Sequence, residues 1–62
     1  MKIKVFSYDD SGDDCRRETF YTTVDGKEFT LAACALGLNA EIIAEIERNA
    51  RVYFGDSVEI DW

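Results

Sequence analysis

A β-hairpin is encoded by residues 18–31, which read ETFYTTVDGKEFTL. The first half of this stretch is rich in β-branched and aromatic residues, which favour strands. Asp25 and Gly26 follow, and both residue types tolerate the positive φ angles of a type I′ turn. We therefore predict a strand over residues 18–24, a two-residue turn, and a short strand over residues 27–31 that pairs back onto the first.

Strands are also predicted near both ends of the chain. Residues 2–8 alternate well enough for a strand, and residues 57–62 alternate without exception between apolar and polar side chains. The acidic residues on the outer face of the last strand suit the lysines of the first, so the two strands are expected side by side, antiparallel or parallel. Residues 9–14 contain only aspartate, serine and glycine, which predicts a loop.

The pattern between these strands predicts two helices. In residues 31–38, Leu31, Cys34, Ala35 and Leu38 lie on one helical stripe, and the segment has high helix propensity. Gly37 suits the end of this helix.

Asn39 suits the N-cap of a second helix, which continues through apolar residues at helical spacing and ends at Gly55. For Val52 to Phe54 a strand is the competing prediction, because valine, tyrosine and phenylalanine favour strands.

Together these elements predict an α+β fold with the order β-β-β-α-α-β, in which one mostly antiparallel sheet carries two helices packed on one face. Residues 1–62 are expected to form a single small acidic α+β domain. The residues expected to face the core are Ile3, Val5, Phe20, Val24, Leu31, Leu38, Ile43, Ile46, Val58, Ile60 and Trp62.

Charge narrows the choice of partners. Thirteen acidic residues against seven basic ones give the chain a formal charge of −6. Such a field repels nucleic-acid phosphates and attracts basic surfaces, so we expect a protein partner with a basic surface and no direct binding of nucleic acid. The alternative is that the charge serves solubility alone. The N-terminus lacks the continuous apolar run of a signal peptide and no segment is long enough to span a membrane, so a cytoplasmic protein without membrane contact is expected.

Nothing in the sequence favours catalysis or a bound cofactor. The chain has no histidine, and its serines lack the sequence context of an activated nucleophile. Asp9, Ser11 and Asp13 have the spacing of the first ligands of an EF-hand loop, but Asp14 stands where glycine is needed and Phe20 where a glutamate belongs. We therefore expect no enzyme, no cofactor and no metal site.

The two cysteines, Cys15 and Cys34, match no metal-binding spacing. Two free thiols are expected, with Cys34 inside the first helix and Cys15 in or near a loop; a single disulfide is the alternative for a secreted protein.

A helix pair is also suggested by residues 33–46, which read ACALGLNAEIIAEI. A small residue, a glycine four positions later, and apolar residues at Ile43 and Ile46 make this segment resemble the helix-turn-helix family. The resemblance implies two packed helices, but the second would present Glu41 and Glu45 to the phosphates of DNA. A small homodimeric structural or regulatory domain built on this helix pair is therefore the alternative function.

Protein binding is the function that accounts for most of these features. Phe6, Tyr8 and Tyr21 are predicted on the sheet face away from the helices, where exposed rings are typical of an interface core. The alternative is that these rings cover a thin core at the edge of the sheet. Two acidic groups complete the candidate protein-binding residues, which are Phe6, Tyr8, Asp9, Asp10, Asp13, Asp14, Tyr21, Glu41 and Glu45.

A narrower version of this hypothesis follows from size and charge alone. In both respects the chain is similar to small phage-encoded inhibitors of CRISPR or restriction systems, which mimic nucleic acid and block a protein that binds it. The similarity implies an inhibitor of a nucleic-acid-binding protein.

Overall fold

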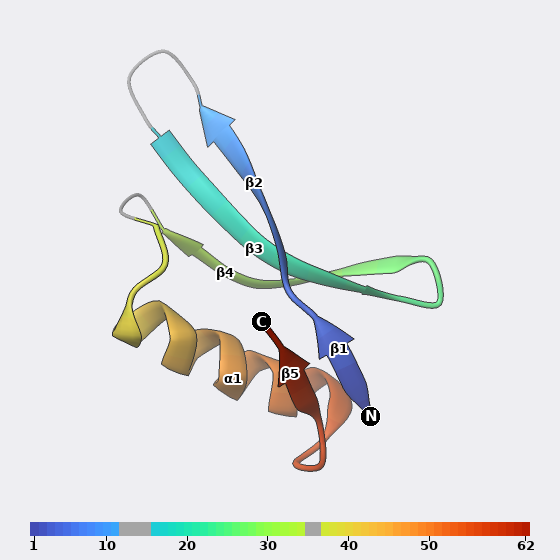
Figure 1. Ribbon diagram of the computed structural model, residues 1–62. Helices are drawn as coiled ribbons and strands as arrows, with labels where there is room; N and C mark the ends of the chain where they lie inside the picture. Colours follow the sequence, from blue (N-terminus) through green and yellow to red (C-terminus); the bar gives the residue numbers. More distant parts are fainter. Residues whose placement is uncertain (12–15, 35–36) are drawn as a thin grey trace.

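The computed structural model describes the backbone of residues 1–11, 16–34 and 37–62, and the side chains of these residues except 10, 11 and 16. In chain order, the elements are β1 (Lys2–Lys4), β2 (Phe6–Ser11), β3 (Arg16–Val24), β4 (Lys27–Cys34), α1 (Ala40–Phe54) and β5 (Glu59–Asp61). The predicted α+β class is confirmed. The predicted arrangement is wrong in two respects, because the described residues form two sheets and one helix (Figure 1).

The larger sheet is antiparallel, with the strand order β2-β3-β4. The turn between β3 and β4 has φ angles of 54° at Asp25 and 79° at Gly26, and the flanking residues Val24 and Lys27 are paired. Positive φ at both central residues is the conformation of a type I′ turn. The predicted hairpin is therefore confirmed.

The smaller sheet consists of β1 and β5, which run parallel. The predicted first strand is divided at Val5, because the chain pairs with β5 before this residue and with β3 after it. Lys2 lies opposite Glu59 and Lys4 opposite Asp61, so the predicted pairing of lysines with acidic residues is confirmed. A shared parallel ladder holds the two ends of the chain together.

The predicted first helix is wrong, since residues 31–34 belong to β4. Ala32 pairs with Phe20 and Ala33 with Thr19, so the hairpin continues well past its predicted end. Backbone pairing with β3 and the burial of Leu31 outweigh a helix propensity that amounts to only a few tenths of a kcal/mol per residue. The helix pair implied by the resemblance to helix-turn-helix proteins is thereby lost. Cys34 is half-buried at the end of β4, and Cys15 lies outside the described residues.

The second predicted helix is confirmed as α1. The Asn39 side chain accepts a hydrogen bond from the backbone N–H of Ile42 at 3.0 Å, as expected for an N-cap. At the other end Gly55 has a φ of 94° and donates its backbone N–H to the carbonyl of Arg51 at 2.8 Å. Residues 52–54 are helical, which decides against the competing strand.

The predicted loop over residues 9–14 is wrong for residues 9–11, which belong to β2. β2 continues to Ser11, so Asp9 and Asp10 lie in a strand, opposite Glu18 and Arg17. Pairing with β3 along one edge of these residues outweighs their turn propensity. Asp13 and Asp14 lie outside the described residues.

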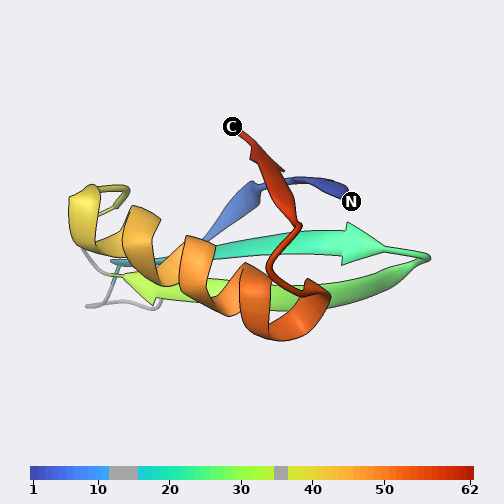
Figure 2. The ribbon, with the colours of Figure 1, turned by 90° about the horizontal axis from the view of Figure 1, so that it is seen from below.

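The core lies between the β3–β4 hairpin, α1 and the β1–β5 ladder. α1 crosses one face of the β3–β4 hairpin, and the β1–β5 ladder lies beside the helix (Figure 2). The buried apolar residues are Ile3, Phe20, Leu31, Ala32, Ile46 and Ala50, with Val5, Val24, Ile42, Phe54, Val58 and Ile60 packed around them. Two residues expected in the core are exposed, Leu38 by 50% and Trp62 by 56%. Leu38 belongs to the predicted first helix, whose residues 31–34 form part of β4 instead, and Trp62 follows the last paired residue of β5.

A β-bulge in β4 determines where the helix packs. Phe20 pairs with Ala32 and its neighbour Tyr21 with Thr30, so Leu31 is an extra residue in the ladder. As a result the consecutive residues Leu31 and Ala32 both join the buried cluster that contains Ile46 and Ala50 of α1. The side-chain amide of Asn49 donates a hydrogen bond to the carbonyl of Leu31. This contact ties the helix to the bulge.

Replacing Ile46 with alanine tests the packing of α1. Ile46 is fully buried, so Ile46→Ala should lower the free energy of unfolding by about 2–5 kcal/mol, measured by urea denaturation. The matched control is Val52→Ala on the same helix, where a side chain that is 76% exposed should change it by about 0.5 kcal/mol or less. Equal stabilities of the two variants would show that the helix is placed in the wrong rotation.

Replacing Asn49 with alanine tests the bulge. Asn49→Ala leaves the carbonyl of Leu31 without its side-chain donor, and we expect a loss of about 1–3 kcal/mol in the free energy of unfolding. Arg48→Ala, at the exposed neighbouring position, is the control and should have little effect. A fully stable Asn49→Ala variant would contradict a structural role for this hydrogen bond.

Candidate protein-binding site

Three aromatic rings form a contiguous group on the antiparallel sheet. Phe6 and Tyr21 are paired across β2 and β3, with ring centroids 5.7 Å apart, and Tyr8 lies 5.5 Å from Tyr21. Both contacts are within the range in which aromatic pairs attract each other. We call Phe6, Tyr8 and Tyr21 the aromatic patch.

The aromatic patch faces away from the core. Phe20, the neighbour of Tyr21 on β3, is buried in the cluster beneath α1, and successive side chains of a strand point to opposite faces. Phe6 is 43% exposed and Tyr8 45% exposed, and neither belongs to the core cluster. The predicted position of these rings, on the sheet face opposite the helix, is confirmed.

The acidic candidate residues with described side chains, Asp9, Glu41 and Glu45, lie on the side of the sheet opposite the aromatic patch. Asp9 is exposed on β2, and its partner across the ladder is Glu18, so two like charges are directly opposed. Glu41 is exposed and Glu45 half-buried on α1, which packs on the other face of the sheet from the aromatic patch. Asp9 follows Tyr8 on β2, but alternation directs its side chain to the opposite face of the sheet, so the structure joins neither Asp9 nor Glu41 and Glu45 to the aromatic patch.

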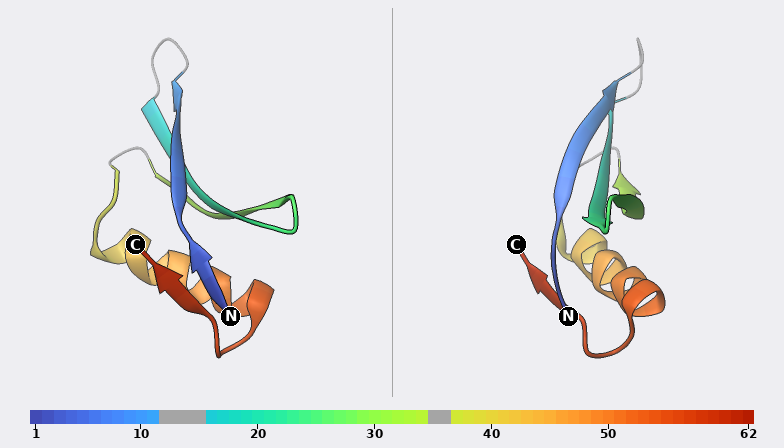
Figure 3. Two further views of the ribbon diagram at one scale, coloured as in Figure 1. Left: turned by 45° about the vertical axis from the view of Figure 1, so that its right-hand side comes forward. Right: turned by 90° about the vertical axis from the view of Figure 1, so that its right-hand side faces the viewer.

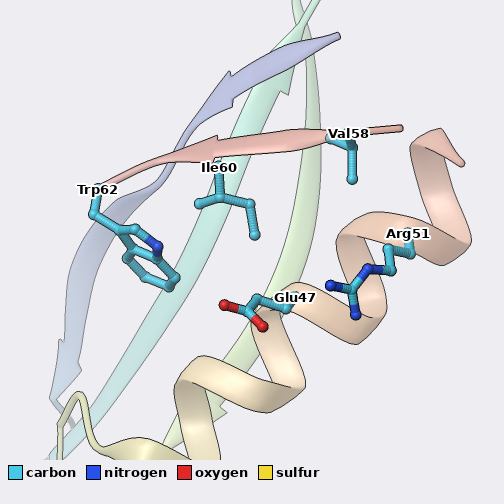
Figure 4. Close-up of a pocket in the computed structure, with 5 residues that line it drawn as sticks. All are labelled: Glu47, Arg51, Val58, Ile60 and Trp62. Atoms are coloured by element: carbon cyan, nitrogen blue, oxygen red, sulfur yellow. The ribbon is translucent and has the colours of Figure 1, made fainter. Parts of the chain in front are cut away.

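Two clefts meet at Trp62, and the sequence pattern indicated neither. The smaller cleft, of about 140 Å³, lies between β5 and α1; its lining residues are Glu47, Arg51, Val58, Ile60 and Trp62. Figure 4 shows the β5-side residues projecting toward the helix, with Trp62 at one end and Glu47 and Arg51 on the opposite wall.

The larger cleft, of about 300 Å³, lies beside β2 and is mostly apolar; its lining residues are Val5, Phe6, Ser7, Glu18, Phe20, Leu38 and Trp62. Phe6 belongs both to this cleft and to the aromatic patch. Alternation predicts Trp62 to be inward, but the indole is 56% exposed at the junction of the two clefts.

The described parts of the chain offer no metal centre. Within residues 1–11, 16–34 and 37–62, no group of three or more cysteine, aspartate or glutamate side chains is arranged to hold a metal ion. In the same ranges, no helix has the length and apolar character that crossing a membrane requires.

Comparisons of the chain with protein-family models, with curated proteins and with solved structures find no match. The geometry of the aromatic patch and of β2, which carries two of its rings, is therefore the basis for the proposed function.

The exposure of Trp62 can be tested by stability. Trp62→Ala should lower the free energy of unfolding by about 1 kcal/mol or less, since the indole is 56% exposed, whereas loss of a buried tryptophan costs about 3–5 kcal/mol. Far-ultraviolet circular dichroism in urea measures this change without relying on the removed fluorophore. A loss in the range of a buried tryptophan would place the indole in the core.

Proposed function

We propose that this protein is a non-catalytic module that binds a basic protein through the aromatic patch. The observation that carries the proposal is the contact of three rings on a sheet face that the helix leaves bare, with Phe6 and Tyr8 each more than two-fifths exposed. Tyrosine and phenylalanine are enriched in interface cores because a large, rigid ring buries much surface at little cost in conformational entropy.

Charge supports a basic partner. The net charge of −6 produces a field that steers positive surfaces toward the protein and repels nucleic-acid backbones. A protein that handles nucleic acid has a surface of the complementary sign. The narrower form of the proposal is therefore an inhibitor that occupies the nucleic-acid-binding surface of its partner, and it is supported by size and charge.

The alternative function, a homodimer built on a helix pair, loses that structural basis in the described residues. The helix pair on which it depended is replaced by a strand and one helix. Association of two copies also brings together two chains of charge −6, which repel each other. Sedimentation at low and high salt distinguishes a dimer from a monomer.

The proposal predicts unequal effects for two similarly exposed tyrosines. Tyr8 is 45% exposed in the aromatic patch, and Tyr53 is 48% exposed on α1, where it contacts Phe29. Once a partner has been captured at low salt and purified, Tyr8→Ala should speed its dissociation about thirtyfold, which corresponds to a hot-spot loss of about 2 kcal/mol. Tyr53→Ala should leave the dissociation rate nearly unchanged.

Surface plasmon resonance with the immobilised partner measures both rates, and circular dichroism confirms that each variant is folded. Equal effects of the two substitutions would contradict binding through the aromatic patch. A partner whose association rate does not fall with added salt would contradict the proposed role of the charge.

A further inference from the structure

The two outer strands of the antiparallel sheet differ in how their free edges are protected. β4 contains the bulge at Leu31, packs against α1, and begins with Lys27. Bulges, lysines and covering helices are the features by which proteins prevent a further strand from adding to an edge. β4 is therefore a protected edge.

β2 has no bulge, no lysine and, among the described residues, no covering helix; its charges, Asp9 and Asp10, are acidic and so oppose a second acidic strand but not a basic one. From Phe6 to Ser11 it pairs with β3 residue for residue, and its sequence, FSYDDS, contains neither lysine nor proline. Residues 6–9 are all exposed. Because an outer strand pairs on one side only, alternate N–H and C=O groups of β2 point outward, and no other strand of the described residues pairs with them. In Figure 3 this strand extends away from α1 and from the β1–β5 ladder.

The two faces of β2 provide different surfaces for an added strand. Phe6 and Tyr8 lie on the face of the aromatic patch, whereas Ser7 lines the larger cleft together with Leu38 and Trp62. The volume of this cleft, about 300 Å³, is roughly twice the ~150 Å³ of an apolar cavity that holds benzene. Because side chains of an added strand alternate between the faces, one apolar side chain would enter the cleft while its neighbours cover the patch.

The carboxylates beside β2 favour a cationic side chain on the added strand. Asp9 follows Ser7 on the cleft side of β2 and is paired with Glu18, which also lines the cleft. Two carboxylates opposed across a ladder repel each other, and a cationic side chain beside them relieves this repulsion. A second copy of the chain would instead bring a further Asp9 to the same edge. A basic segment of another protein is the complementary occupant.

We propose that β2 binds an extended, basic segment of a partner protein as an additional strand, with an apolar side chain in the cleft beside Trp62 and a lysine or arginine beside Asp9 and Glu18. This inference rests on the proposed function and adds the mode of binding. Main-chain hydrogen bonds to β2 supply affinity, and the cleft and the carboxylates select the sequence.

The probe is the blocked peptide Val-Arg-Val-Leu-Val-Arg-Val, a palindrome that places its leucine between two arginines on one face in either strand direction. Trp62 is the only tryptophan of the chain, so its fluorescence reports on the cleft. Titration of the peptide into the protein should shift the emission of Trp62 to shorter wavelength. The same peptide with glutamate in place of arginine should bind at least tenfold more weakly.

Backbone methylation distinguishes strand addition from other modes of binding. One peptide is N-methylated at its odd residues, another at its even residues and a third at every residue. Because the palindrome can turn either edge to β2 by reversing its direction, each of the first two should bind in one direction only, whereas the third has no donor for either edge and should lose binding. If the third peptide binds like the parent peptide, strand addition is wrong, while binding through the aromatic patch is still decided separately by Tyr8→Ala and Tyr53→Ala.

Two variants of equal net charge test the position of the segment. Asp9→Lys should weaken binding of the peptide about fivefold or more, whereas Asp56→Lys, in the exposed turn that follows α1, should change it less than about twofold. Equal effects would show that charge acts only at long range and would overturn the placement beside Asp9. A stable dimer in sedimentation that the peptide neither binds nor dissociates would overturn the proposal in favour of a second copy on β2.

Discussion

The bulge at Leu31 is the constraint on which the rest of the structure depends. Without it, neighbouring residues of β4 would point to opposite faces, and only one of Leu31 and Ala32 would reach the helix. With it, both join Ile46 and Ala50 in the buried cluster, and the side-chain amide of Asn49 donates a hydrogen bond to the carbonyl of Leu31, the extra residue. The helix is thus held against β4 by apolar packing and by the hydrogen bond from Asn49 to Leu31, which, unlike apolar packing, requires a defined orientation of donor and acceptor.

The placement of α1 over β4 determines which surfaces are left bare. A chain of 62 residues hides only about 60% of the surface it exposes when unfolded, so one helix cannot cover both faces of a three-stranded sheet. The core lies under β3 and β4, and the β1–β5 ladder closes its open side (Figure 2). The opposite face, with the aromatic patch, and the free edge of β2 remain accessible.

The proposed function and the proposed mode of binding draw on the same strand. β2 carries two rings of the aromatic patch, a wall of the larger cleft, and the exposed carboxylate of Asp9. The carboxylates of Glu41 and Glu45 on α1 lie on the other face of the sheet and contribute to the field at a distance, as steering rather than as contact. In the proposed binding, the net charge therefore attracts the partner at long range, and the apolar surface of β2 contacts it at short range.

Sequence alone determined the features that depend on neighbours a few residues apart. Asp25 and Gly26 specify the turn, Asn39 and Gly55 delimit α1, and alternation assigns Tyr21 to the face opposite Phe20. Tertiary structure decided what depends on distant partners. Residues 31–34 have the composition of a helix but become a strand because β3 offers them a continuous ladder. The break at Val5, the bulge at Leu31 and the exposure of Trp62 arise in the same way: each is set by pairing and packing between segments far apart in the chain, whose free energies exceed local propensity and leave no local pattern.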